Sequence, residues 1–123
     1  MQNSERFRRG VVVPLDDVAA DALATWEVDE STPVHFVEIE SQRDFETLWK
    51  TGFFASLNEQ IGFLLDDYEE ERISYEVVLE LRRVAESFAS RGAGGVVGAR
   101  FFSALVEACD IAQSKQQPVY FVL

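Results

Sequence analysis

Cysteine is almost absent from this chain, and the single residue present, Cys109, cannot form an internal disulfide. The first nine residues are polar and lack the apolar segment of a secretory signal. No apolar run approaches the roughly 20 residues that cross a bilayer as a helix. We therefore expect a cytoplasmic protein of a reducing compartment that does not bind a membrane.

The residue types that carry most enzymatic chemistry are also scarce. His35 is the only histidine, and it lies in a predicted strand among apolar residues, where we expect a structural role. For His35 and Cys109 to form a catalytic pair, the Cys109 thiol would have to be exposed and its pKa lowered, although it lies on the core side of a predicted helix. Zinc sites need several Cys and His ligands, and the chain has one of each. We predict no catalytic residue, no metal site and no cofactor.

Glycine is concentrated in one place, with four of the seven glycines in residues 92–98. Arg91 and Arg100 flank this run, which precedes a predicted helix and offers backbone N–H groups to an anion. Dinucleotide and P-loop motifs place a strand before such a loop, and the P-loop motif ends in Lys-Ser/Thr. Here a helix precedes the run and no Lys-Ser/Thr follows it. We interpret the run as a mobile surface connection, not a phosphate site.

Basic residues are outnumbered by acidic ones, 11 against 22, and the net charge is −11. The excess is uneven: residues 11–75 contain sixteen Asp or Glu and three Lys or Arg, whereas residues 76–123 contain five of each. Residues 1–10 carry three Arg and one Glu, and we expect residues 1–8 to form a flexible leader. An acidic field repels nucleic acids and attracts basic proteins. The composition thus predicts no nucleic-acid partner.

Apolar residues make up 47% of the chain and include ten Phe, enough for an aromatic core without disulfides. A length of 123 residues predicts one domain, residues 1–123. Residues 9–13 form a β-branched run stopped by Pro14 and are predicted to be a strand. Apolar spacings of three and four predict a helix over residues 15–26.

A second strand is predicted over residues 34–40, where His35, Val37 and Ile39 alternate with residues of the opposite face. A strand, a helix and a strand in this order predict two parallel strands joined by a right-handed crossover. Apolar periodicity predicts further helices over residues 42–51, 54–71, 75–90 and 99–113, and the apolar end of the chain predicts a strand over 119–123. The predicted fold is α+β, a small, mostly parallel three-stranded sheet packed with about five helices.

The densest candidate site is a run of five carboxylates around Tyr68 at the end of the predicted helix 54–71. Its members are Asp66, Asp67, Glu69, Glu70 and Glu71. In a helix they would repel one another one turn apart and crowd the C-terminus, where the dipole prefers cations. Such violations of local rules gather at functional sites.

Three interpretations of the acidic run remain open: a solvated polar face, a docking patch for a basic protein, or a carboxylate site for a divalent cation. The run lacks the glycine and the alternating oxygen ligands of a calcium-binding EF-hand loop. Trp26 and Tyr75 lie near predicted helix ends among acidic residues, as interface aromatics often do. We include both in the predicted partner-binding set with the five carboxylates.

The sequence therefore favours a non-catalytic acidic binding protein that neutralises or escorts a basic protein partner, as small immunity proteins and inhibitors do. Charge and size suggest this comparison, and no family motif does. Two alternatives stay open: a small dimeric acidic chaperone, and an enzyme that uses carboxylates with Mg²⁺ on a small substrate. The oligomeric state expected is a monomer for an inhibitor and a homodimer for a chaperone.

Overall fold

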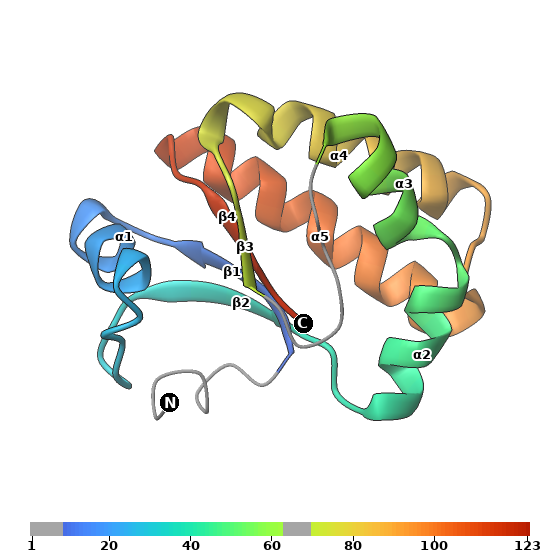
Figure 1. Ribbon diagram of the computed structural model, residues 1–123, viewed down its shortest axis with the longest axis horizontal. Helices are drawn as coiled ribbons and strands as arrows, with labels where there is room; N and C mark the ends of the chain where they lie inside the picture. The colour runs from blue at the N-terminus through green and yellow to red at the C-terminus, as the bar shows by residue number, and fades with distance from the viewer. Residues whose placement is uncertain (1–8, 63–69) are drawn as a thin grey trace.

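A computed structural model of the chain describes residues 9–62 and 70–123, which form a four-stranded sheet with helices on both of its faces (Figure 1). The helices α2, α3, α4 and α5 cover one face, and the short helix α1 lies on the other. The elements in chain order are β1 (Gly10–Pro14), α1 (Asp17–Ala24), β2 (Val34–Glu38), α2 (Gln42–Lys50), α3 (Phe53–Ile61), β3 (Glu70–Ile73), the 3₁₀ helix η2 (Tyr75–Val77), α4 (Val78–Ser90), α5 (Gly95–Lys115) and β4 (Val119–Val122).

The sheet has the strand order β2-β1-β4-β3, and every neighbouring pair is antiparallel. The prediction of a mostly parallel three-stranded sheet is therefore wrong. The chain reverses between β1 and β2, since the N–H of Leu15 donates to the carbonyl of Pro33 at 3.0 Å. A parallel crossover would have to run back along the whole length of β1, about 17 Å for five residues. The eight residues of α1 span only about 12 Å, and the loop after them returns to the end of β1 at which α1 began.

The prediction of a single helix over residues 54–71 is also wrong at both ends of its second half, while residues 63–69 lie outside the described residues. Helix α3 ends at Ile61, where Gly62 adopts a left-handed conformation with φ 83°, a common helix stop. Residues 70–73 form β3 instead, with Ile73 paired to Val119 and fully buried. Three of the four residues of β3 are charged, so the apolar pattern of a strand is missing from the sequence.

The glycine-rich run is not simply a connection, because its second half is the first turn of α5. This helix begins at Gly95, four residues before the predicted start. A Cβ at Gly98 would collide with the backbone carbonyl of Ala93, so the close approach of these two segments requires glycine there. The other predicted helices agree with α2, with η2 followed by α4, and with the rest of α5.

The main core lies between the helices and the face of the sheet that carries Val11, Val13 and Val37. Its centre is aromatic: the ring of Phe53 contacts those of Phe102 and Phe88 edge-on, with centroids 4.9 and 5.4 Å apart. Burial of these side chains is the dominant stabilising term for such a domain. The aromatic core expected from the composition is present.

A smaller core occupies the opposite face of the sheet. Val12, Tyr120 and Val122 are buried there against Leu23 of α1. Helix α1 begins at the cap residue Asp16, whose carboxylate accepts a 2.7 Å bond from the N–H of Ala19. No helix within the described residues is long and apolar enough to span a membrane.

Candidate functional site

The structure splits the predicted acidic run. Asp66, Asp67 and Glu69 lie outside the described residues, and Glu70 opens β3. Glu70 pairs with Val122 and Glu71 with Phe121, two positions on opposite faces of the sheet. The crowding expected at a helix end therefore does not apply to the part of the run in β3.

The two predicted aromatics belong to different segments of the fold. Trp26 packs on the smaller core, edge-on to Tyr120. Glu71, through its partner Phe121, belongs to the face that the other helices cover. Tyr75 starts the 3₁₀ helix η2 just after β3 and is half-buried. The structure thus does not bring Trp26 together with Glu71.

Cys109 lies on the buried side of α5 and is fully covered. Burial raises the pKa of its thiol to about 12, with a further contribution from the charge of Asp110 that Arg82 partly offsets. A thiol of this kind is protonated at neutral pH and is a poor nucleophile. Within the described residues, no group of three or more His, Cys, Asp or Glu is placed to hold a metal ion.

The described part of the protein has a groove of about 270 Å³ along the edge strand β2. We call it the β2 groove. Its apolar floor consists of Val37 and Ile39 from the sheet side, Leu48 from α2, and Phe101 and Ala104 from α5. The groove was not among the predicted sites.

Strand β2 forms one side of the groove because its residues alternate between two environments. Val37 and Ile39 face the main core, while Phe36 packs on the smaller core. His35 shares the register row of Val13 and lies at the groove, half-buried. The alternation predicted for residues 34–40 is present.

Helix α5 supplies the opposite wall. Val97, Phe101 and Ala104 recur at spacings of four and three, which places them on one face of the helix. Arg100 and Glu107 line the groove from the same helix and are exposed. The N-terminal turn of α2 closes one end through Asp44, held by the bond from its N–H to the Ser41 hydroxyl at 3.1 Å.

The rim of the β2 groove is acidic. Four acidic residues line it, Glu38, Glu40, Asp44 and Glu107, against one basic residue, Arg100. None of these five groups forms an ion pair with another residue of the described ranges. The groove therefore combines an apolar floor with carboxylates whose charges the described part of the protein leaves uncompensated.

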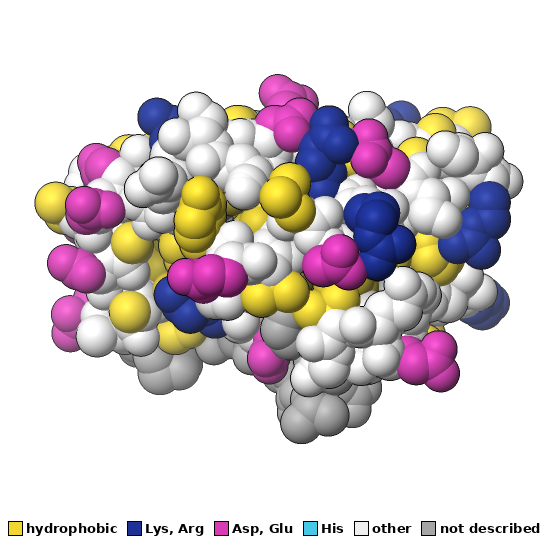
Figure 2. All heavy atoms as spheres, turned by 90° about the horizontal axis from the view of Figure 1, so that it is seen from above, with side chains coloured by type: hydrophobic (Ala, Val, Ile, Leu, Met, Phe, Trp, Pro, Cys, Tyr) yellow, Lys and Arg dark blue, Asp and Glu magenta, His cyan; other side chains and the backbone are white. Residues whose placement is uncertain are grey.

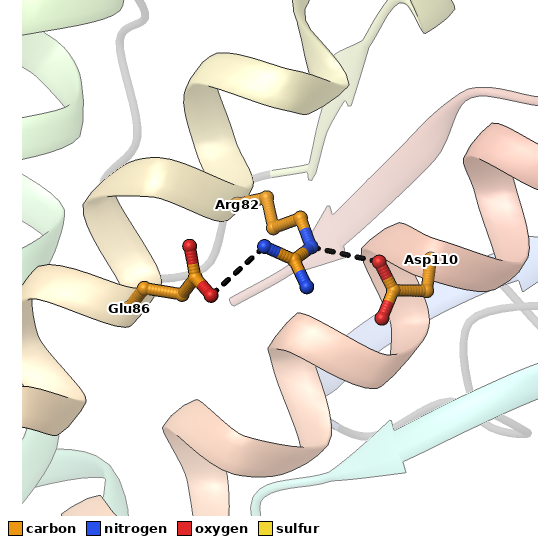
Figure 3. Close-up of polar contacts among 3 residues, drawn as sticks. All are labelled: Arg82, Glu86 and Asp110. Atoms are coloured by element: carbon orange, nitrogen blue, oxygen red, sulfur yellow. Dashed lines mark hydrogen bonds and ion pairs between the residues drawn. The ribbon is translucent and has the colours of Figure 1, made fainter.

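The opposite situation holds on α4 and α5. Arg82 bonds Glu86 at 2.8 Å and Asp110 at 2.7 Å, joining the two helices (Figure 3). Arg83 bonds Glu80 at 2.7 Å. Seen from above, Lys and Arg lie beside Asp and Glu over the middle of this layer, while Asp and Glu gather toward the end where α1 lies (Figure 2). The arginines thus neutralise acids of the C-terminal third and not those of the β2 groove.

A sequence signal for this side of the protein exists. Residues 10–42 contain eight Asp or Glu and no Lys or Arg, and they include β1, α1 and the edge strand β2. The carboxylates are denser at residues 66–71. Comparison of the chain with protein-family profiles, curated protein sequences and solved structures found no match.

Proposed function

We propose that this protein is a non-catalytic acidic binding protein that neutralises or escorts a basic protein partner, and that the partner docks at the β2 groove. The observation that carries the proposal is the combination at this groove of apolar lining residues with four acidic residues and one basic residue. Apolar surface supplies binding free energy when it is covered, and the charges select the sign of the partner.

The charge distribution supports a fast encounter with such a partner. An uneven field of one sign steers oppositely charged proteins and raises association rates, more so at low salt. The described arginines of α4 are already occupied by Glu80, Glu86 and Asp110. These two arginines therefore do not compensate the acidic residues of the segment 10–42.

The test is affinity capture with the intact protein at about 0.05 M and about 0.5 M NaCl, which differ strongly in screening. Wild type is compared with the triple variant Glu38→Gln, Glu40→Gln, Glu107→Gln. A matched control, Glu30→Gln, Glu59→Gln, Glu76→Gln, removes the same number of charges from exposed positions away from the groove. Far-UV circular dichroism and a thermal melt confirm that all three proteins are folded.

The expected result is a basic protein captured by the wild type and the control at low salt, with capture and association rate reduced at least about tenfold in the groove variant. Equal loss in both variants would mean that net charge acts without the groove. Capture of only neutral or acidic proteins would contradict the proposed function.

A further inference from the structure

The backbone of β2 pairs with β1 along one edge, and along its other edge no strand of residues 9–62 and 70–123 pairs with it. Ile39 donates its N–H to the carbonyl of Arg9 at 2.9 Å, and Leu15 donates to Pro33, so the bonded pairs of the β1–β2 ladder are known. In an antiparallel ladder these pairs recur at every second residue. His35, Val37 and Ile39 therefore direct their backbone groups to β1, and Glu38 directs its own away from it.

Strand β2 is the last strand of the described sheet on that side. The backbone groups of Glu38 thus face the β2 groove edge, where no strand of residues 9–62 and 70–123 pairs with them. An extended segment laid along this edge would gain main-chain hydrogen bonds as a fifth strand. One face of such a segment would lie over the apolar floor, and the other would lie beside Glu38.

We propose that the basic partner binds by strand addition, with an extended segment of alternating apolar and Lys or Arg residues pairing with the open edge of β2. This inference rests on the proposed function, and it specifies the form of the partner. Apolar residues of the segment would cover Val37 and Phe101, and its cations would meet Glu38 and Glu40 at the rim. A cation opposite Glu38 is the favourable cross-strand pair.

A second copy of this chain is a poorer occupant of the same edge. Pairing of β2 with another β2 would bring two acidic rims together, each with four acidic residues and one basic residue. Like charges facing each other across a strand pair are destabilising. Charged residues on edge strands prevent such self-pairing, and the same charges attract a basic strand.

The probe is a synthetic peptide of about eight residues in which Lys and Val alternate, long enough to match the five residues of β2. Its affinity is measured by isothermal titration against that of the matching Glu and Val peptide. Two further versions of the Lys and Val peptide are N-methylated. The first carries a methyl group on every Val amide, and the second carries one on every Lys amide. Each version removes the hydrogen-bond donors from one edge of the peptide and leaves the other edge intact.

Strand addition predicts that the Lys and Val peptide binds and the Glu and Val peptide does not. It also predicts that one N-methyl version loses at least about tenfold in affinity while the other stays close to the parent peptide, because only one edge pairs with β2. If the peptide docked through its side chains alone, the two N-methyl patterns would change its affinity by the same amount. Equal affinities of the two versions, or no binding of the parent peptide, would overturn the inference.

A second readout leaves both molecules unmodified. Amide hydrogen exchange followed by NMR should show the Glu38 N–H slowed by the peptide, while those of Val37 and Ile39 are already protected by β1. If the Glu38 amide is already protected without peptide, and this protection grows with protein concentration, the edge pairs with a second copy of the chain. That result would overturn the inference. If charge-dependent capture of a basic protein persists while these tests fail, the proposed function stands without strand addition.

Discussion

The indole ring of Trp26 meets the ring of Tyr120 edge-on, with centroids 5.9 Å apart and an interplanar angle of 74°. Trp26 follows α1, and Tyr120 lies in β4, so the contact fastens the α1 segment to the sheet face opposite the main core. Such pairs contribute about 0.5–1.5 kcal/mol beyond the area they bury. The contact makes Trp26 a stabilising residue of the smaller core.

Replacement of Trp26 by Ala should lower the free energy of unfolding by about 1–3 kcal/mol, since the side chain is half-buried. Trp26→Phe keeps a ring against Tyr120 and should lose less. Urea denaturation followed by circular dichroism measures both. Capture of the basic partner by the folded Trp26→Ala protein should match that of the wild type, because the β2 groove lies on the other face. Weaker capture would show that Trp26 contributes to binding of the partner.

Gly10 begins β1 with φ 152°, and a Cβ there would collide with the backbone carbonyl of Val37 in β2. Gly10→Ala should therefore disrupt the β1–β2 pair and cost more than about 3 kcal/mol. Gly92→Ala is the control, since Gly92 has φ 69° with open space around the Cβ position and should cost only about 1 kcal/mol. Thermal melts compare the two. Similar losses would show that the backbone angle, and not the contact with Val37, sets the cost.

Patterns within one element were predictable, and relations between elements were not. The alternation of His35, Val37 and Ile39 predicted that these residues share one face of the sheet, and Val37 and Ile39 do lie in the main core. The direction of strand pairing was not predictable, because a strand has the same period of two in a parallel and an antiparallel sheet. The short α1 and its return loop decided the direction.

The β2 groove could not be found from one segment of sequence. Its lining residues come from residues 35–48 and 97–107, which are distant in the chain and meet only because α5 crosses the sheet beside β2. Strand β3 was hidden for a different reason: only Ile73 of its four residues is apolar, so no alternation was visible. The acidic excess of residues 10–42 was visible, yet its meaning depended on β2 being an edge strand.

Arg82 joins α4 to α5, and its loss should lower the melting temperature slightly. In the wild type, the hydrogen bond that Arg82 donates to the Asp110 carboxylate raises the pKa of the guanidinium. In Arg82→Gln both ion pairs are lost, with Glu86 and with Asp110. Because these groups are exposed, the decrease should be small and should shrink in about 1 M NaCl. A double-mutant cycle with Asp110→Asn isolates the coupling between the helices.

Arg83→Gln is the control, since the ion pair of Arg83 among the described residues is with Glu80, within α4. It should show no coupling to Asp110→Asn. A coupling of equal size in both cycles would mean that Asp110 acts through general charge and not through its bond to Arg82. Neither variant should change capture of the basic partner, because both arginines lie away from the β2 groove.

The buried thiol of Cys109 predicts a specific dependence of stability on pH. Its pKa in the folded protein is raised from 9.0 to about 12, so the unfolded chain loses the thiol proton at lower pH than the native protein does. The stabilisation is complete below pH 9 and is lost as the pH rises from about 9 toward about 12. In Cys109→Ala this contribution is absent. Between pH 9 and 11 the wild type should therefore lose stability more steeply than the variant, by no more than about 1.4 kcal/mol per pH unit.

The same burial makes Cys109 a reporter of unfolding. A disulfide reagent such as dithionitrobenzoate reacts with the thiolate, and at pH 8 the native protein offers neither a thiolate nor access to the sulfur. Labelling of the native protein should therefore proceed only through opening of α5, and its rate should rise with urea in step with the unfolded fraction. Protein unfolded in about 6 M urea, which exposes the thiol, should react within the mixing time. Rapid labelling of native protein at pH 8 would mean that α5 opens locally, and it would remove the basis for the alkaline prediction as well.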